Sequence, residues 1–534
     1  MIEECFEVEQ LHKQQNNGKD FDSENLTDFL PNDADSKPKL TRWATFSVVV
    51  ASFCGCLPYG YALGSVNSAA VPIKSFIGSQ YMIRYNTTAS QSEIDTIFVF
   101  IVASFPVGGI CGCFLVPPMV NQFGKLRSMA YLHACTTIAA ILMGLSEVMM
   151  SYEIIIIGRF VVGCVTSSAG TGISPMYSVE VVPKEWRGTF GGLVSFFISF
   201  GVLVSNTLGL SQVLGNPDHW PVLLALIGFP GLLYLICCTF LANSPRTLYL
   251  TKGDTFGAEE LLKKLRNSDD VGDEMEILAK EKREQESTSL MTVLELFRSG
   301  TLRHQVVATL VVSLSQQLSG LNGVVIYMNQ LFGLAGVPEN VVPFCSIAST
   351  ALLSFSTLGT VRLLDRLGRK PLLKYGFMGQ ASSLILLTIT AEIKTEATWL
   401  PYLSLIFASV FLVSFAVGPG PVTLLLVSEI FPQRSRPAAI TLSCVSIFFG
   451  FAVTVIVWPY MQSSMGGYAY LPFAFIAVSC AVFVHLCVPE TKGKTFVETE
   501  RAFHSMQIDH KWCKGKTEPV EINANSPMHA DTSV

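Results

Sequence analysis

The stretch Ser313-Leu314-Ser315-Gln316-Gln317-Leu318-Ser319-Gly320-Leu321-Asn322 places three carboxamide side chains inside an apolar run that extends from Val306 to Phe332. A carboxamide in hydrocarbon is costly unless it finds a partner or lines a cavity. Gln316, Gln317 and Asn322 carry no charge but offer both donors and acceptors, which suits a neutral polyhydroxylated solute better than an ion. The stretch therefore predicts a membrane-embedded site for a sugar-like solute.

The composition of the whole chain agrees with a membrane setting. Charged residues make up 14% of the 534 residues and apolar residues 50%, and the mean hydropathy is +0.45. Apolar windows of roughly twenty residues, the length that spans a bilayer, recur from Trp43 to Val488, and about twelve of them can be placed. We expect an all-α polytopic membrane protein with twelve transmembrane helices.

The distribution of basic residues predicts the topology. Lys and Arg are sparse between Val66 and Glu93 but dense between Asn243 and Arg303, so the second segment is expected in the cytoplasm. Six spans then lie on each side of it, and both termini are expected in the cytoplasm. The predicted divisions are a disordered tail (1–42), a six-helix half (43–242), a linker with short amphipathic helices (243–303), a second six-helix half (304–488) and a carboxyl-terminal tail (489–534).

Several other features bound the function. Asn86-Thr87-Thr88 falls in the first outer loop, where it is a candidate acceptor for an N-glycan. The fourteen cysteines lie mostly inside apolar spans, which favours packing over metal or disulfide chemistry. The net charge of −5 comes with no basic patch and no nucleotide-binding loop. We therefore expect no metal, cofactor, nucleic-acid partner or enzymatic activity.

Two groups of residues recur at nearly the same offset along the chain. One offset is 249 residues (429 − 180) and the other is 244 residues (368 − 124). The first group is Glu180, Pro183 and Arg187, repeated as Glu429, Pro432 and Arg436, and the second is Gly124-Lys125, repeated as Gly368-Arg369. A chain built twice predicts two six-helix halves with a solute site at their interface near the bilayer midplane.

The repeated charges predict a gate on the cytoplasmic side. Glu180 and Glu429, with Arg187 and Arg436, stand at span ends where they are expected to pair with the bases of the neighbouring loops, Lys125 and Arg369. Such clusters would hold the cytoplasmic side closed and would break when it opens. The alternative is static anchoring of basic residues at the membrane surface.

The chain resembles the sugar porters of the major facilitator superfamily, and among them the facilitative hexose transporters of animals. The resemblance covers nearly all of Trp43 to Thr495. It rests on Gly158-Arg159-Phe160, Pro175-Met176-Tyr177 through Arg187-Gly188, Ser244-Pro245-Arg246, Gln316-Gln317-Leu318-Ser319-Gly320, Asp365 to Lys370, Gly418-Pro419-Gly420-Pro421 and Pro489-Glu490-Thr491-Lys492-Gly493. It implies twelve helices, a cytoplasmic helical bundle in the central loop, and uniport of hexoses such as glucose by alternating access.

The resemblance also implies roles for individual residues. Gln316, Gln317 and Asn322 occupy the positions that bind sugar hydroxyls in the family, Asn67 matches a position near the outer entrance, and Tyr327 matches one of two gate tyrosines. Interhelical hydrogen bonding is the alternative role for the amides. The prolines and glycines of Gly418, Pro419, Gly420 and Pro421 predict a hinge or a static kink.

Several sugar-contacting positions of the family are changed in this chain. Ser195 replaces a glutamine, Leu353 an asparagine, Ala416 a glutamate and Leu424 a tryptophan, while Ile447-Phe448 replaces an Asn-Trp pair. Ser313-Leu314-Ser315 replaces a Gln-Leu-Ser signature linked to glucose over fructose. Each lost partner for a buried hydroxyl weakens affinity by roughly 0.5–1.5 kcal/mol. The changes disfavour high-affinity glucose transport and leave open fructose, another neutral solute, weak transport, or a non-transporting sensor or scaffold.

The first span indicates how transport is driven. Proton-coupled sugar porters carry an acid in the first span opposite the arginine matched by Arg159, but Ala44 to Ile73 contains no Asp or Glu. This favours uniport over proton symport.

The terminal Asp531-Thr532-Ser533-Val534 fits the pattern that PDZ domains accept, and short patterns of this kind also arise by chance. A hexose transporter of this type is expected in the plasma membrane.

Overall fold

The structure is a computed structural model that describes residues 40–183, 186–287, 290–393, 399–494 and 498–503. The chain divides into residues 1–40 and a unit that starts at Thr41. Nearly all of the described residues belong to the second unit. The predicted amino-terminal tail and the PDZ-type carboxyl terminus lie outside the described residues.

The predicted count of twelve membrane spans is confirmed. Eleven helical segments of the described residues are long and apolar enough to cross a membrane, and the last of them, Arg436–Cys487, contains two helices joined by a short turn. The spans of the first half are α2 (Arg42–Ser68), α4 (Gln91–Phe123), α5 (Lys125–Gly144), α6 (Glu153–Thr166) with η1 (Ser167–Ile173) and α7 (Ser174–Val181), α8 (Arg187–Leu208), and α9 (Trp220–Ala225) with η3 (Leu226–Gly228), α10 (Phe229–Cys237) and η4 (Cys238–Phe240). The spans of the second half are α14 (Arg303–Leu318) with α15 (Leu321–Ile326), α17 (Val342–Leu367), α18 (Arg369–Glu392), α19 (Leu400–Val417) with α20 (Pro419–Ile430), α21 (Arg436–Met465) and α22 (Leu471–Cys487).

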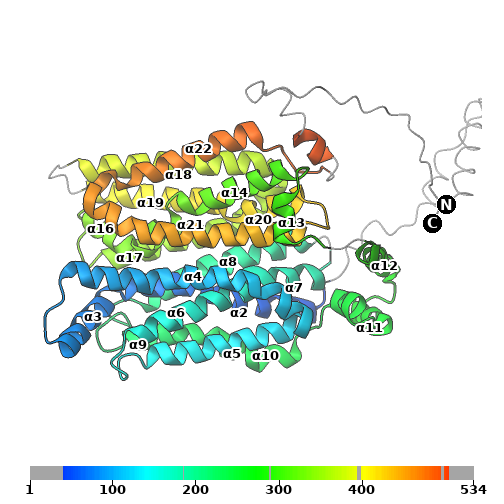
Figure 1. The fold of residues 1–534 in the computed structure, drawn as a ribbon, viewed down its shortest axis with the longest axis horizontal. Coiled ribbons are helices and arrows are strands. Elements are labelled where there is room, and N and C mark those ends of the chain that lie inside the picture. The colour runs from blue at the N-terminus through cyan, green and yellow to red at the C-terminus, as the bar shows by residue number, and fades with distance from the viewer. Residues whose placement is uncertain (1–39, 184–185, 288–289, 394–398, 495–497, 504–534) are drawn as a thin grey trace, which may run out of the picture. The chain divides into compact units, whose positions relative to one another are not determined.

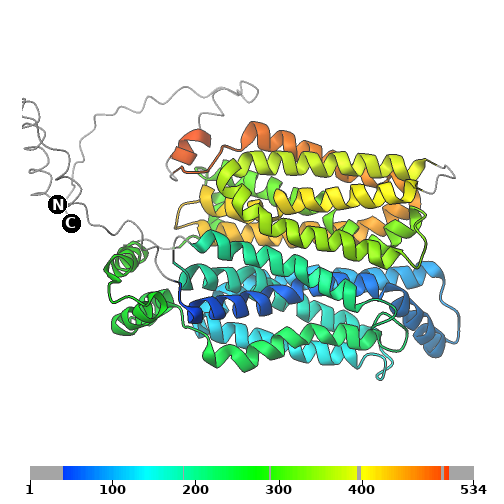
Figure 2. The ribbon, with the colours of Figure 1, turned by 180° about the vertical axis from the view of Figure 1, so that it is seen from behind.

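The remaining helical elements lie between the spans. They are α3 (Ala70–Tyr85), η5 (Thr247–Thr251), α11 (Thr255–Arg266), α12 (Gly272–Ser287), α13 (Val293–Arg298), α16 (Met328–Leu334) and η6 (Gly466–Tyr470). Figures 1 and 2 show α3 at one end of the spans, and α11 and α12 at the opposite end.

The spans group into two halves that follow the sequence repeat. In Figures 1 and 2 the helices α2 to α10 lie together, and so do α14 to α22. The halves meet where α4 packs against α21, α8 against α17 and α2 against α15. The approach of α4 to α21 is so close that a Cβ on Gly109 would lie 2.3 Å from the ring of Phe448. Glycine at this position lets the halves pack directly on each other.

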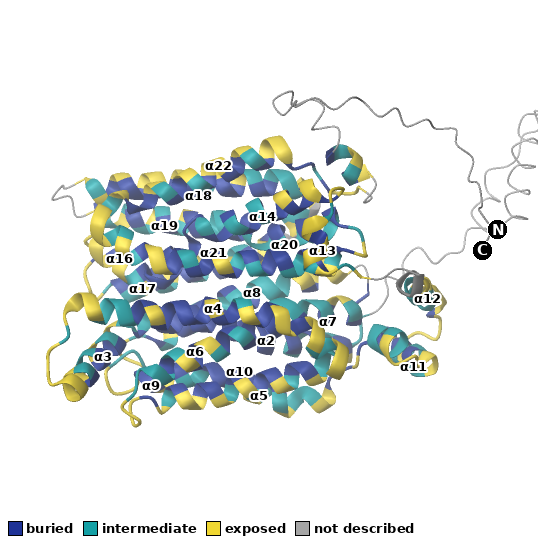
Figure 3. Cartoon of the chain, viewed as in Figure 1, coloured by how far each residue is buried: buried dark blue, intermediate teal, exposed yellow. Residues whose placement is uncertain are grey.

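Burial separates the inner helices from the surface that faces lipid. Exposed residues lie on the outward faces of the bundle, while α2 and α4 are largely buried (Figure 3). Phe100, Ile236 and Phe475 lie on three different spans, and each is more than 60% exposed. Large apolar side chains exposed on many helices suit hydrocarbon rather than water. The protein is therefore a multi-pass membrane protein.

The segment between the halves contains the short helices α11, α12 and α13, and α11 contacts the first half. The hydroxyl of Thr41, the N-cap residue of α2, donates to the carbonyl of Leu265 at 3.0 Å. The guanidinium of Arg266 donates to the carbonyl of Val181 at 2.8 Å and forms an ion pair with Glu274 of α12 at 2.7 Å. The linker is thus attached to the ends of α2 and α7.

Candidate transport site

The seventh span is broken where its sequence carries the amides. Helix α14 ends at Leu318, Gly320 adopts a left-handed φ of +91°, and α15 starts at Leu321. Glycine tolerates this conformation without strain. At the break the carbonyl of Gln317 accepts from the backbone N–H of Gly320 at 3.1 Å and from the hydroxyl of Thr454 in α21 at 3.0 Å. The amides therefore lie on both sides of a stabilised break.

The tenth span is broken at Gly418, between α19 and α20. A Cβ on Gly418 would lie 2.5 Å from the carbonyl of Leu372 and 2.8 Å from Cα of Gly376, both in α18. Pro419 begins α20 and has no N–H to donate to the preceding turn. Close packing requires the glycine and the proline interrupts the ladder, so Gly418 to Pro421 form a discontinuity in the helix.

The three amides of the seventh span form a connected set. Gln316 Nε2 donates to the carbonyls of Pro419 at 2.8 Å and Gly420 at 3.1 Å, whereas its Oε1 is buried without a hydrogen-bond partner. Asn322 Nδ2 donates to Gln317 Oε1. Among the described residues, no hydrogen bond engages Gln317 Nε2 or Asn322 Oδ1. Gln317 Nε2 and Asn322 Oδ1 are therefore a donor and an acceptor without a described partner, and Gln316 Oε1 is a further unpartnered acceptor that is buried.

The amides line a cavity between the two halves. Its empty volume is about 1060 Å³, which includes solvent space at its mouth, and both halves contribute to its lining. Tyr59 and Leu63 of α2 and Ser195 of α8 face it from the first half, and Gln316, Gln317 and Asn322 from the second. A concave site shared by two halves, with a few convergent polar groups, is typical of a transporter site.

The changed positions identified in the sequence surround this cavity. Leu353 of α17, Ala416 of α19, Leu424 of α20 and Ile447 of α21 all line it, as does Ser195. The segment Ser313-Leu314-Ser315 is not part of the cavity lining. The Ser313 hydroxyl instead lies 2.6 Å from that of Ser443 in α21, and this contact holds α14 and α21 together.

Asn67 and Tyr327 lie outside the cavity lining. The backbone N–H of Asn329 in α16 donates to Asn67 Oδ1 at 3.3 Å, which joins the two halves beyond the amides. Asn67 Nδ2 donates to Asn206 Oδ1 at 3.4 Å. The Tyr327 hydroxyl donates to the carbonyl of Val455 at 3.3 Å. In this conformation both side chains fasten helices rather than contact the central space.

Arg159 is a buried cation with neutral partners. Its Nε donates to the carbonyl of Ile101 at 2.8 Å, one terminal nitrogen donates to that of Ala62 at 3.1 Å, and the guanidinium lies 5.4 Å from the centre of the Phe105 ring. The other terminal nitrogen is buried without a partner, and none of the ion pairs described includes Arg159. No carboxylate that could carry a proton is therefore paired with this cation.

The end of the first half that adjoins the linker holds a charged network that extends to the second half. Lys125 lies 2.8 Å from Glu180, and Arg246 lies 3.8 Å from Glu180 and 2.7 Å from Glu281 of α12. The Glu281 carboxylate also accepts from Gln433 Nε2, at 3.1 Å, in the loop before α21. Glu281 thus connects the halves, a role that no motif in the sequence indicates.

The corresponding network of the second half is internal to that half. Arg369 pairs with Glu429 at 2.8 Å. The carboxylate of Glu490 accepts from the backbone N–H groups of Arg369 at 2.9 Å and Lys370 at 3.1 Å. Each half therefore holds an ion pair between one acid and one loop base, Glu180 with Lys125 and Glu429 with Arg369.

The two repeated arginines are arranged differently from the expectation. Arg187 is exposed at the start of α8, and the ion pairs described for Glu180 join it to Lys125 and Arg246. Arg436 is half-buried at the start of α21, and it donates to Gln433 Oε1 at 3.0 Å. Neither arginine takes part in the described pairs of Glu180 or Glu429.

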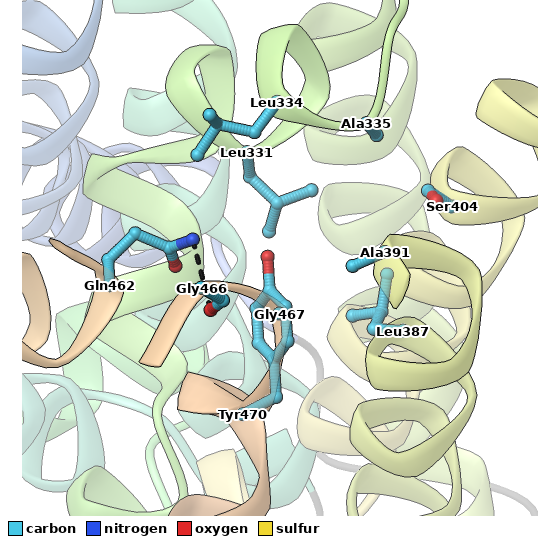
Figure 4. A pocket seen from close by; sticks show the side chains of 10 residues that line it. All are labelled: Leu331, Leu334, Ala335, Leu387, Ala391, Ser404, Gln462, Gly466, Gly467 and Tyr470. Carbon is cyan, nitrogen blue, oxygen red and sulfur yellow. Dashed lines mark hydrogen bonds between the residues drawn. The ribbon is translucent and has the colours of Figure 1, made fainter. Parts of the chain in front are cut away.

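A second cavity, of about 570 Å³, lies within the second half (Figure 4). The Tyr470 side chain projects into it among aliphatic residues such as Leu331, and Gln462 Nε2 donates to the carbonyl of Gly466 at 3.3 Å beside it. All of its lining residues belong to the second half. Movement of one half against the other would not expose it alternately.

These features define a class of protein, the membrane transporters in which two six-helix halves enclose a central site. The family model described as "Sugar (and other) transporter" matches residues 47–503. The chain is 34% identical to the facilitated glucose transporter member 5 of solute carrier family 2 from Equus caballus, over 88% of this chain and 93% of that protein. It is 34% identical to member 1 of the same family from Gallus gallus, over 84% and 91%.

The fold has a counterpart among solved structures. The xylose transporter XylE from E. coli, in a partially occluded inward-open conformation, superimposes with a TM-score of 0.70 at 23% identity, over 85% of this chain and 100% of that chain. This likeness shows the twelve-helix major facilitator fold. Taken with the family match and the sequence relatives, the protein belongs to the sugar transporter family, which is a family of transporters rather than enzymes.

Proposed function

We propose that the protein carries a hexose across the membrane by facilitated diffusion, through alternating access to the cavity between its halves. The observation that carries this proposal is the cluster of Gln316, Gln317 and Asn322, which leaves uncharged donors and acceptors in that cavity. Ser195 is proposed to contribute a hydroxyl from the opposite half. Relatives named as facilitated glucose transporters support the choice of substrate class.

The proposed mode of transport is uniport. Proton coupling at a site like this needs a carboxylate that exchanges a proton near the buried cation. Arg159 contacts two carbonyls and a ring face, and the first span offers no acid. The gradient of the sugar itself is then the driving force.

The proposed gates lie on either side of the cavity. The Lys125–Glu180 and Arg369–Glu429 pairs, with Glu281, are proposed to hold the cytoplasmic side closed. Asn67 and Tyr327 are proposed to belong to the outer gate, since they fasten helices beyond the amides. Gly418 to Pro421 are proposed to act as a hinge of the tenth span. Arg187 and Arg436 are proposed to add charge at the cytoplasmic surface.

The proposed setting is the plasma membrane, with both termini in the cytoplasm. Asn86 is exposed just after α3, at the end of the spans opposite the linker, which supports its proposed role as a glycan acceptor. The terminal Asp531-Thr532-Ser533-Val534 is proposed to bind a PDZ domain.

The test is counterflow in proteoliposomes that contain the purified protein. Labelled glucose, galactose, mannose and fructose are each offered to vesicles preloaded with the unlabelled sugar. Saturable counterflow without acidification of the lumen is the expected result, and absence of counterflow with all four sugars contradicts a hexose carrier.

A second candidate function is a sensor that binds a sugar without carrying it. The apolar residues at Leu353, Ala416, Leu424 and Ile447 favour it, because they leave fewer partners for hydroxyls than the family's sites have. Sugar binding measured by calorimetry, in the absence of counterflow, would support this alternative.

A further inference from the structure

The polar atoms that are free to meet a solute in the second half lie on one side of the cavity. Gln316 Oε1 has no partner, and no described hydrogen bond engages Gln317 Nε2 or Asn322 Oδ1. All three belong to the seventh span, Gln316 and Gln317 on α14 and Asn322 on α15. The first half adds the hydroxyls of Ser195 and Tyr59, which also face the cavity.

Other hydroxyls around the cavity already donate within their own helices. The Thr171 hydroxyl donates to the carbonyl of Ser167 at 2.8 Å. The Ser199 hydroxyl donates to that of Ser195 at 3.1 Å, and the Thr357 hydroxyl donates to that of Ser354 at 2.6 Å. Their protons are therefore used in the protein, and these groups offer a solute only acceptor capacity. They do not extend the donor set of the amides.

Apart from Thr357 and Cys444, the other side chains of the second-half lining are apolar. Leu353, Ala416 and Phe448 are buried, Leu424 and Ile447 are half-buried, and they come from α17, α19, α20 and α21. None of these side chains has a donor or an acceptor. A solute hydroxyl pressed against them would lose its water without gaining a hydrogen bond, which is the costly case for a polar group.

Resting on the transport function proposed above, we propose that the site selects amphipathic neutral sugars. The favoured solute carries its hydroxyls along the edge that meets Gln316, Gln317 and Asn322, and hydrogen, methyl or O-alkyl on the edge that meets Leu353 and Leu424. Deoxyhexoses and O-methyl hexoses have this chemistry. Removing one stranded hydroxyl should improve transport efficiency by roughly tenfold, because the unpaired group no longer has to be desolvated.

The test compares glucose with analogues that differ at single positions. Uptake of labelled D-glucose into proteoliposomes is competed by 2-deoxyglucose, 6-deoxyglucose, 3-O-methylglucose and methyl glucoside, and each analogue is then measured as the labelled substrate. At least one analogue is expected to exceed glucose about tenfold in transport efficiency. If glucose equals or exceeds every analogue, the inference is overturned while the carrier function stands. Absence of flux with all of the compounds contradicts the carrier function itself.

Variants of the apolar wall give an independent test. Leu353→Asn adds a donor and an acceptor to it, and Leu353→Met is the matched change that adds neither. The ratio of analogue to glucose transport is expected to fall about tenfold in Leu353→Asn relative to Leu353→Met. Ala416→Ser repeats the test on another helix. An unchanged ratio in a polar variant that still transports overturns the inference, and the analogue series on the unmodified protein decides the matter if neither polar variant folds.

Discussion

The hydrogen bond between Glu281 and Gln433 offers a direct test of the proposed cytoplasmic gate. Glu281 belongs to the linker helix α12, which is tied to the first half through Arg246, and Gln433 precedes α21 in the second half. The bond therefore exists only while the two halves are close at the ends that adjoin the linker. Glu281→Ala should shift the protein towards the conformation that is open to the cytoplasm.

The size of that shift follows from the contact. A hydrogen bond to a charged group contributes about 1.5–3 kcal/mol when it is well shielded. The side chains of Glu281 and Arg246 are 20% and 35% exposed and Gln433 is exposed, so solvent screening reduces the value to about 1 kcal/mol. One kcal/mol corresponds to about a fivefold change in the ratio of the two conformations.

The assay measures distances between spin labels at the cytoplasmic ends of α8 and α21, in protein whose exposed native cysteines have been replaced. Gln433→Ala and the double variant complete a thermodynamic cycle, and Glu281→Gln tests whether a neutral acceptor suffices. Glu276→Ala changes an exposed acid of the same helix that is in none of the described ion pairs, and it serves as the control. A coupling energy below about 0.3 kcal/mol between Glu281 and Gln433 would refute the proposed contact between the halves.

Three further substitutions test the site, the coupling and the hinge. Gln317→Ala should weaken hexose affinity about 2- to 12-fold, measured by competition in counterflow, because it removes one hydrogen bond to the solute. Ala62→Asp introduces an acid near Arg159, because the Ala62 carbonyl lies 3.1 Å from the guanidinium. Uptake should then become dependent on external pH, whereas the neutral variant Ala62→Asn should not have this effect. Gly418→Ala should destabilise the protein by about 1–3 kcal/mol through its clash with α18, measured by thermal unfolding, while Gly359→Ala, with nothing within 4 Å, should not.

The sequence predicts the fold well because the bilayer imposes a simple rule. Backbone groups in hydrocarbon must be paired within helices, so apolar runs of sufficient length become spans. The internal repeat adds the pairing of acids with loop bases, and the structure brings Lys125 next to Glu180 and Arg369 next to Glu429. Spacing along the chain was informative in these cases because each pair lies within one half.

Contacts that depend on docking could not be predicted in the same way. Glu281 contacts Gln433 because α12 is held at the ends of the two halves, where Arg246 also donates to Glu281. No local sequence pattern predicts that placement of α12. The direction of a side chain is also decided by packing, so Tyr327 and Asn67 match family positions and yet fasten neighbouring helices. The neutral partners of Arg159 similarly require knowledge of which carbonyls surround it.

The two ends of the Gln316 side chain contact different parts of the transporter. Its nitrogen is bonded to the carbonyls of Pro419 and Gly420 at the break in the tenth span, and its oxygen is the unpartnered acceptor at the cavity. Because the carboxamide is planar and rigid, a solute that draws the oxygen towards itself must also rotate the nitrogen against those carbonyls. Binding of a solute at this oxygen would therefore disturb the hydrogen bonds that Gln316 makes at the break in the tenth span.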